Sequence, residues 1–115
     1  PKGEILVVAM IEDVKGLSNL DDILTRVPGI GVVLIGEGDL SQNLGHPREY
    51  DHPIVREAMA EIVAICKKHG VAAGQPHVGP GNIDRVMDEG YRFMLAKPTV
   101  TYPALQRGLE RSGRI

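Results

Sequence analysis

Residues 31–45 read GVVLIGEGDLSQNLG, and the interpretation of the whole chain depends on this stretch. Its first part, 31–35, is a short apolar run that predicts a strand, and the continuous apolar run at 4–10 (EILVVAM) is typical of a strand buried on both faces. The polar stretch that follows, 36–51, contains several glycines and a proline and predicts a long loop. Pro53 then stands where the first residue of a helix is expected. The sequence here predicts a strand that leads through a loop into a helix.

The same strand-then-helix pattern recurs on both sides of this stretch. The expected strands are 4–10 (EILVVAM), 31–35, 71–74 and 91–96, and the expected helices are 18–26, 53–69, 82–89 and 102–111. Ser18 or Asn19 is the expected cap of the first helix, with Asp21 and Asp22 in its first turn. Residues 75–81 (QPHVGPG) are expected to form a loop. Strands that alternate with helices predict an α/β fold with a parallel sheet.

Length and composition limit the possible classes of protein. The 115 residues are enough for a single domain, which we assign to 1–115. A formal net charge of −2 argues against a nucleic-acid-binding surface, and no apolar run is long enough to cross a membrane. One cysteine cannot form an internal disulfide, so we expect a cytoplasmic protein.

Two architectures accommodate four βα units. One is a small open doubly wound sheet, and the other is half of a (β/α)8 TIM barrel, because four units of a barrel of about 250 residues need about 125. Length alone does not choose between them. In both architectures ligands bind at the carboxyl ends of the strands. The polar residues just after the expected strands are therefore the first candidates for a site: Glu12, Asp13, Glu37, Asp39, Gln75, His77 and Lys97.

Glu12 and Asp39 follow the first two strands. Neighbouring strands lie about 4.8 Å apart, so the two carboxylates can meet at one point if these strands are adjacent. Like charges that converge there require a proton or a cation, and Mg²⁺ suits one or two carboxylates with water and substrate oxygens completing its shell. An equally good interpretation is that both acids cap turns. Gly36 and Gly38 flank a turn whose backbone N–H groups can face an anion, although an isolated G-x-G is usually an ordinary turn.

The remaining candidates point less strongly to chemistry. His46 and His52 lie in the long loop beside prolines, His69 lies in the last turn of a helix, and His77 has no evident partner in the sequence. Cys66 falls on an apolar helix face and is expected to be packed in the core. Lys97 follows the last strand, where a lysine can form a Schiff base, but a solvated or ion-paired side chain is the simpler interpretation.

Several motifs, taken together, resemble the HpcH/HpaI aldolase and citrate lyase family. They are MIE at 10–12, NLDDIL at 19–24, VPGI at 27–30, IG at 35–36, DLS at 39–41, LG at 44–45 and HP at 52–53. AG at 73–74 and GYRF at 90–93 match more loosely. The resemblance spans essentially the whole chain, in the order and spacing of the family. The motifs are specific for the family only when they are taken together.

The resemblance implies that the chain is the C-terminal half of a (β/α)8 barrel. By the same resemblance Glu12 and Asp39 bind a divalent cation (Mg²⁺, Mn²⁺ or Co²⁺), and the backbone of the turn at Gly36, Gly38 and Asp39 holds the substrate carboxylate. Such enzymes are lyases that cleave 4-hydroxy-2-oxo acids to pyruvate and an aldehyde, or catalyse the reverse condensation.

The sequence departs from the pattern of this family at several positions. Glu37 replaces the usual proline, Asp13 replaces a small hydroxyl residue, and Lys97 begins an unusual end to the last strand. The catalytic His and the substrate-binding Arg of the family lie in its N-terminal half, which no segment here matches. A catalytic residue is therefore not assigned, and we expect the chain to pair with an N-terminal half-barrel or to form a homo-oligomer.

Two other functions are compatible with the sequence. The stretch ILVVAMIED at 5–13 and the LAKP at 95–98 are reminiscent of receiver domains, which gather acids and a lysine around Mg²⁺. Receivers have five strands and place the acceptor Asp after the third, whereas four strands are expected here and Asp39 follows the second. The other possibility is a non-catalytic fragment that folds and oligomerises.

Overall fold

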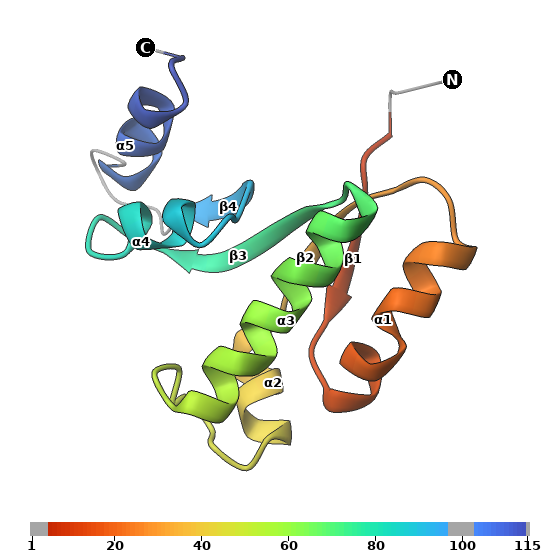
Figure 1. Cartoon of the computed structure of the whole chain (residues 1–115). Helices are drawn as coiled ribbons and strands as arrows, with labels where there is room; N and C mark the ends of the chain where they lie inside the picture. Colours follow the sequence, from red (N-terminus) through yellow and green to blue (C-terminus); the bar gives the residue numbers. More distant parts are fainter. Residues whose placement is uncertain (1–4, 97–102, 115) are drawn as a thin grey trace.

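The computed structural model describes residues 5–96 and 103–114. Its elements follow one another as β1 (Val7–Ile11), α1 (Val14–Arg26), β2 (Ile30–Ile35), α2 (Glu37–Asn43), α3 (Pro53–His69), β3 (Ala72–Val78), α4 (Ile83–Asp88), β4 (Phe93–Ala96) and α5 (Pro103–Arg111). Figure 1 shows the strands at the centre of the molecule, with α1 and α3 beside each other and α4 and α5 toward the C-terminus. The expected alternation of strands and helices is confirmed.

The sheet has four strands in the order β1-β2-β3-β4, and every pair is parallel. Each strand therefore pairs with the next strand along the chain. A doubly wound sheet instead reverses its strand order at a switch point. The consecutive order is that of an open arc of a (β/α)8 barrel, so the half-barrel expectation is confirmed and the doubly wound alternative, with the receiver fold, is wrong.

One hydrophobic core lies between the sheet and the helices. Its buried members come from β1 to β3, from α1 to α5 and, at Tyr91, from the segment before β4: Ile11, Leu17, Leu20, Val33, Ile35, Leu40, Ala58, Ile62, Cys66, Ala73, Val78, Ile83, Val86, Tyr91 and Ala104. Side chains alternate between the two faces of a strand, so Val33 and Ile35 face the helices whereas Val32 and Leu34 face the other side. The helices therefore cover one face of the sheet, as they cover the outside of a barrel.

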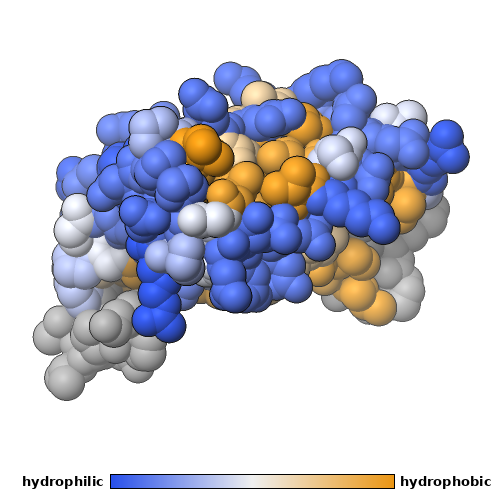
Figure 2. Space-filling view, turned by 90° about the horizontal axis from the view of Figure 1, so that it is seen from below, coloured by the Kyte–Doolittle hydropathy of each residue, from blue (hydrophilic) through white to orange (hydrophobic). Residues whose placement is uncertain are grey.

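The opposite face of the sheet is apolar and only partly covered. Val8 and Met10 of β1 are 40% and 52% exposed, and Leu95 of β4 is 46% exposed. The expectation that the first strand is buried on both faces is therefore wrong, because no helix among the described residues covers this face. β1 and β4 are also the edges of the sheet in the described part of the chain. Figure 2 shows apolar side chains between hydrophilic borders in the view from below. Apolar residues at open sheet edges favour association with another polypeptide.

The first helix begins earlier than expected. Asp13 is its N-cap, and its side chain accepts a 2.6 Å hydrogen bond from the N–H of Gly16. The predicted cap at Ser18 or Asn19 is wrong, and Asp21 and Asp22 lie well inside α1 rather than in its first turn. A carboxylate that satisfies an otherwise unpaired N–H at a helix start explains why Asp13 takes this position.

Part of the expected loop at 36–51 is helical. α2 begins directly after β2, and Leu40 on this helix is fully buried in the core. The glycines and polar residues conceal this helix in the sequence, because Leu40 is its single apolar residue and its other buried residues, Glu37 and Ser41, are polar. The helix matters for function because it places Glu37 and Asp39 at the end of the sheet.

The third strand is longer than expected and includes residues 75–78, which the sequence predicts to be loop. Gln75 pairs with Met94 and Val78 pairs with Ala96, with an irregular register between the two pairs. This irregularity accommodates Pro76, which lacks an N–H for the ladder. The strand thus extends far enough to bring His77 to the carboxyl edge of the sheet.

The long third helix agrees with its prediction. Pro53 occupies its first turn, and Gly70 ends it with a left-handed backbone at φ 68°. α4 begins after Asn82 as expected, and the described part of α5 begins at Pro103. Within residues 5–96 and 103–114, none of the helices has the length and hydropathy to cross a bilayer.

Candidate functional site

Glu12 and Asp39 meet at the carboxyl ends of β1 and β2. Glu12 follows β1 directly, and Asp39 lies in the first turn of α2, which follows β2. The two strands are neighbours in the sheet, so their carboxyl ends are adjacent. The two carboxyl groups hydrogen-bond with each other and line an open depression together with Asp13, Gln42 and Asn43. The expectation that these acids converge is therefore satisfied geometrically.

Gly36 allows this convergence. Its N–H donates a 2.9 Å hydrogen bond to the carbonyl of Ile11, which ties the end of β2 to the end of β1. A Cβ on Gly36 would lie 2.8 Å from the Cβ of Glu12 and 3.2 Å from its Oε2. Non-bonded carbons do not approach so closely. A larger residue at this position would push Glu12 away from its present place.

The electrostatics of the acid pair favour a cation. The pKa of the Glu12 carboxyl is raised, first by its hydrogen bond with Asp39 and then by repulsion from the charge of Asp39. Burial and the charge of Asp13 raise it further. Ionising both of two carboxyl groups this close together costs free energy, unless a proton or a positive ion lies between them. The donor set consists of oxygens, which are the ligands that hard divalent cations prefer.

The neighbouring polar side chains have other roles. Asp13 caps α1, and the side-chain oxygen of Asn43 accepts a 2.9 Å hydrogen bond from the N–H of Val14. Among the described residues, no group of three or more His, Cys, Asp or Glu side chains could hold a metal ion. A divalent ion here would thus have two protein carboxylates and would take its other ligands from water and substrate, an arrangement typical of Mg²⁺.

Comparison with known proteins shows the family of this chain. The profile of the HpcH/HpaI aldolase/citrate lyase family matches residues 1–96. The chain belongs to this family. It is 33% identical over 91 residues to a hydroxypyruvate/pyruvate aldolase of Paraburkholderia phytofirmans, covering 79% of this chain and 35% of the relative. It is 34% identical over 91 residues to a 2-keto-3-deoxy-L-rhamnonate aldolase of Klebsiella pneumoniae, covering 79% of this chain and 34% of the relative.

Solved structures of the HpcH/HpaI family have the same fold over nearly the whole chain. A family member from Burkholderia cenocepacia superposes with a TM-score of 0.75 and 26% identity, covering 96% of this chain and 42% of that structure. An HpcH/HpaI aldolase from Desulfitobacterium hafniense also gives a TM-score of 0.75, at 28% identity and with the same coverage. The chain thus spans about a third of the length of these curated relatives and less than half of these solved structures.

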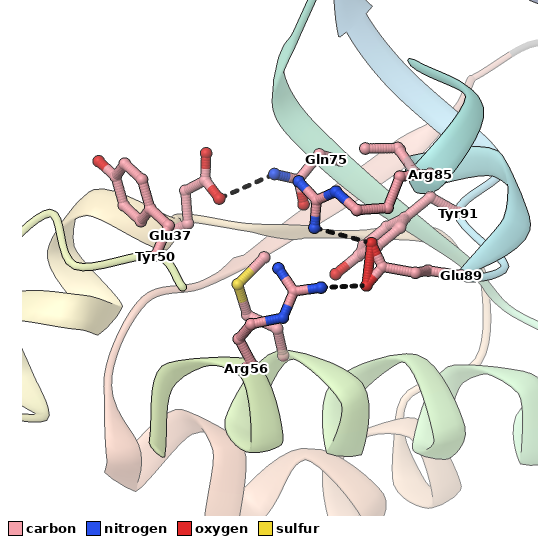
Figure 3. A pocket seen from close by; sticks show the side chains of 9 residues that line it. Glu37, Tyr50, Arg56, Gln75, Arg85, Glu89 and Tyr91 are labelled. Atoms are coloured by element: carbon pink, nitrogen blue, oxygen red, sulfur yellow. Dashed lines mark hydrogen bonds and ion pairs between the residues drawn. The ribbon is translucent and has the colours of Figure 1, made fainter. Parts of the chain in front are cut away.

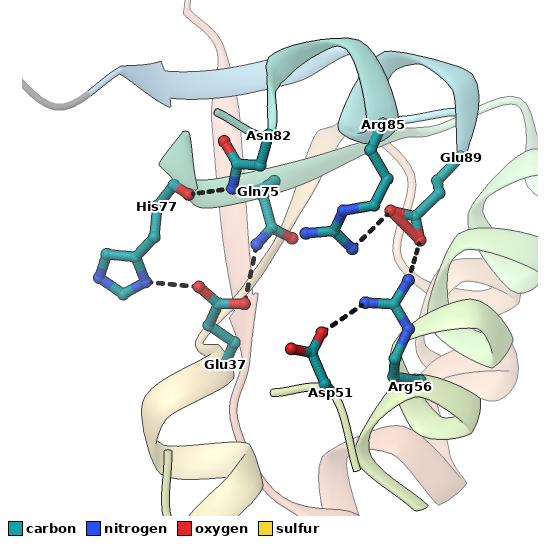
Figure 4. A network of polar contacts seen from close by, with 8 residues as sticks. All are labelled: Glu37, Asp51, Arg56, Gln75, His77, Asn82, Arg85 and Glu89. Carbon is teal, nitrogen blue, oxygen red and sulfur yellow. Dashed lines mark hydrogen bonds and ion pairs between the residues drawn. The ribbon is translucent and has the colours of Figure 1, made fainter. Parts of the chain in front are cut away.

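A second polar cluster lies at the carboxyl ends of β2 and β3. Glu37 of α2 is 4% exposed. Its Oε1 lies 2.6 Å from Nδ1 of His77, and its Oε2 accepts a 2.8 Å hydrogen bond from Nε2 of Gln75 (Figure 4). The sequence suggested all three residues as separate candidates, but the expectation that His77 has no partner is wrong. Glu37 and His77 are 40 residues apart in the chain, so only the adjacent strands bring them together.

The Glu37 cluster borders a small polar cavity between the sheet, α3 and α4 (Figure 3). On its far side Arg56 and Arg85 both pair with Glu89, at 3.3 Å and 3.0 Å. The cavity has a volume of about 30 Å³, which leaves room for water but not for a substrate. Oε1 of Gln75 is buried without a hydrogen-bond partner among the described residues, and a water in the cavity would satisfy it.

The other candidates that the structure describes make contacts that stabilise the fold. Nδ1 of His52 accepts a 3.2 Å hydrogen bond from the N–H of Ile54, and the ring stacks on His46 with centroids 3.6 Å apart. His69 pairs with Asp21 of α1 in addition to its place at a helix end. Cys66 is buried as expected, and burial raises the pKa of its thiol to about 11. Lys97 lies outside the described residues.

Proposed function

We propose that the chain supplies the cation-binding part of a divalent-metal-dependent (class II) aldolase. The substrate class is the 4-hydroxy-2-oxo acids, which such an enzyme cleaves to pyruvate and an aldehyde or forms by condensation. The convergence of Glu12 and Asp39 is the single observation that supports this most strongly, since neighbouring strands hold two carboxylates together at the end of a barrel-like sheet where ligands bind. The names of the curated relatives support a carbon–carbon lyase.

The roles proposed for the residues are those that the resemblance to the family implies. Glu12 and Asp39 would hold Mg²⁺, Mn²⁺ or Co²⁺ through carboxylate oxygens, and the backbone at Gly36, Gly38 and Asp39 would bind the carboxylate of the 2-oxo acid. When bound, the ion supplies a positive charge that polarises the 2-oxo group and stabilises the enolate of pyruvate. Gly38 leaves its surroundings open, since the hydroxyl of Tyr50 would be the nearest atom to an added Cβ, at 3.7 Å.

The uncovered face of the sheet indicates that another part of the enzyme packs against it. Val8, Met10 and Leu95 are exposed on the face away from the helices, and β1 and β4 present edges among the described residues. In a closed barrel these groups face the interior or pair with further strands. In this proposal an N-terminal half-barrel or a second copy of this chain covers them, and the enzyme acts in the cytoplasm.

Titration with Mn²⁺ tests the proposal directly. We expect the chain to bind Mn²⁺, and to bind it more tightly in the presence of pyruvate, as measured by electron paramagnetic resonance of the free ion. Glu12→Gln and Asp39→Asn should each abolish binding, because a single carboxylate leaves the ion with too few charged ligands. Asp22→Asn, which removes an exposed acid on α1, should bind as the native chain does. Unchanged affinity in both site variants would contradict the proposal.

A further inference from the structure

The side-chain amide of Gln75 has an orientation that its contacts determine. Its Nε2 donates a 2.8 Å hydrogen bond to Oε2 of Glu37, whose other oxygen lies 2.6 Å from Nδ1 of His77. A carboxylate only accepts hydrogen bonds, so the NH₂ group of Gln75 must face it, since the reversed amide would bring two acceptor oxygens together. The amide oxygen Oε1 therefore points away from Glu37.

This oxygen lies at the small polar cavity between the sheet, α3 and α4. Gln75 is 4% exposed, and its Oε1 has no hydrogen-bond partner among the described residues. Figure 4 shows the oxygen on the side of Arg85, which lines the same cavity. A buried amide oxygen without a hydrogen bond costs free energy, and native proteins rarely leave one unpaired. The cavity therefore requires an occupant that donates a hydrogen bond to Oε1.

The charges around the cavity favour a neutral occupant. Arg56 and Arg85 contribute two guanidinium groups to its lining, and Glu37 and Glu89 contribute two carboxylates. Glu89 pairs with both arginines, at 3.3 Å and 3.0 Å. A cation in this space would lie beside the guanidinium groups, and an anion would lie beside the carboxylates, so both would be repelled at short range. The occupant that fits is uncharged and both donates and accepts hydrogen bonds.

The volume of the cavity identifies this occupant as water. The cavity measures about 30 Å³, and a water needs about 10–15 Å³ of such volume, so there is room for about two molecules. An internal water also needs several polar partners. Oε1 of Gln75 is an acceptor, and the guanidinium of Arg85 has N–H donors besides the one on Nη1 that bonds to Glu89. The lining therefore offers a water both an acceptor and donors.

A water at this position would connect elements that are far apart in the chain. Gln75 belongs to β3, Arg56 to α3 and Arg85 to α4, and Glu89 is the C-cap of α4. Among the described residues, no hydrogen bond joins the group of Gln75 and Glu37 to the group formed by Glu89 and the two arginines. A water between the two groups makes them one network.

We propose that this cavity is an internal hydration site, in which a water donates a hydrogen bond to Oε1 of Gln75 and accepts one from the guanidinium of Arg85. The site is separate from the proposed function and needs neither a metal ion nor a substrate. The water fixes the amide of Gln75, and this amide in turn holds the carboxylate of Glu37. The internal water is thus part of the structure that keeps Glu37 in place at the carboxyl end of the sheet.

Magnetic relaxation dispersion of ¹⁷O in water counts the long-lived waters inside the folded chain. Val86 is 1% exposed and lines the cavity, so Val86→Leu fills the cavity but keeps Gln75. We expect this variant to hold about two fewer internal waters than the native chain. Gln75→Met, which removes the acceptor, should lose the same waters. Val55→Leu is the matched control and should keep the native number, because Val55 is also buried on a helix but does not line the cavity.

A high-resolution crystal structure of the native chain identifies the occupant without relying on the folding of a variant. We expect a water within about 3.2 Å of Oε1 of Gln75 and within the same distance of a guanidinium nitrogen of Arg85. A direct hydrogen bond from Arg85 to Oε1, with no water between them, would overturn the proposal. An equal number of internal waters in the native chain and in Val86→Leu would overturn it as well.

Discussion

Two acidic regions flank the first turn of α2, and their environments are opposite. On the side of β1, Glu12 and Asp39 face each other, and the pKa of Glu12 is raised, first by its hydrogen bond with Asp39 and then by the charge of Asp39. On the side of β3, Glu37 is more deeply buried but both of its oxygens are engaged by donors, from Gln75 and His77. The same chemical group thus faces another acid in one region and hydrogen-bond donors in the other.

In the proposed function the two regions have different roles. The region of Glu12 binds a ligand, whereas Glu37 holds neighbouring side chains in place. A pair of facing carboxylates at an open surface gains free energy when a cation binds, which is the role given to the region of Glu12 in the proposed function. A buried carboxylate saturated by hydrogen bonds gains nothing from a cation and instead stabilises the groups that donate to it. The contrast can be tested by removing a component of each region in turn.

The largest effect on stability should come from Glu37→Ala. This change leaves the buried amide of Gln75 without its acceptor and releases His77, and it should lower the free energy of unfolding by about 3 kcal/mol. Urea denaturation measures the change. Glu49→Ala is the matched control, because Glu49 also pairs with the Nδ1 of a histidine, at 3.0 Å, but is exposed. It should cost at most about 1 kcal/mol. Equal losses in the two variants would contradict the difference in burial.

An intermediate effect is expected from Gly36→Ala. The added methyl group would meet Glu12, so the ends of β1 and β2 must move apart, at a cost of about 1–3 kcal/mol. Mn²⁺ affinity should fall by at least about tenfold, or about 1.4 kcal/mol, because the carboxylates no longer converge. Gly81→Ala is the control, since a Cβ there meets nothing within 4 Å. Native Mn²⁺ affinity in Gly36→Ala would show that the close approach at Gly36 is not needed.

The smallest expected effect is a pH dependence of the free energy of unfolding, caused by Glu12. Because its pKa is raised above the ordinary value of 4.5, the folded chain binds more protons than the unfolded chain between 4.5 and the raised pKa. The free energy of unfolding contributed by Glu12 therefore falls as the pH rises through this range. Asp39→Asn should remove this fall, and Mg²⁺ should oppose it in the native chain. Urea denaturation as a function of pH provides the measurement, and an identical slope in Asp39→Asn would contradict the assignment of cause.

Much of the fold could be predicted from local patterns. The long helix α3 was evident because Pro53 begins it and Gly70 ends it, with apolar residues at helical spacing between them. The apolar run at 31–35 predicted a strand, and β2 forms there with neighbours on both sides. The convergence of Glu12 and Asp39 could also be anticipated, since both follow strands that are consecutive in the chain and adjacent in the sheet.

The errors in prediction share a cause, which is that a nonlocal contact overrides a weak local signal. α2 forms because Leu40 is buried in the core beside the sheet, although its sequence is polar and rich in glycine. β3 continues through Pro76 because β4 pairs with it at Gln75 and again at Val78. In neither segment does the amino-acid composition show which contacts the neighbouring element will make.

The sequence by itself determined the alternation of strands and helices, the end of the sheet at which the acids gather, and the membership of the family. These features depend on local periodicity and on residues close together in the chain. The tertiary structure alone decided that Glu37 pairs with His77 and that one sheet face lacks helices, because such outcomes depend on strand order and register. Register shifts by single residues move a side chain to the opposite face, and no local pattern encodes that choice.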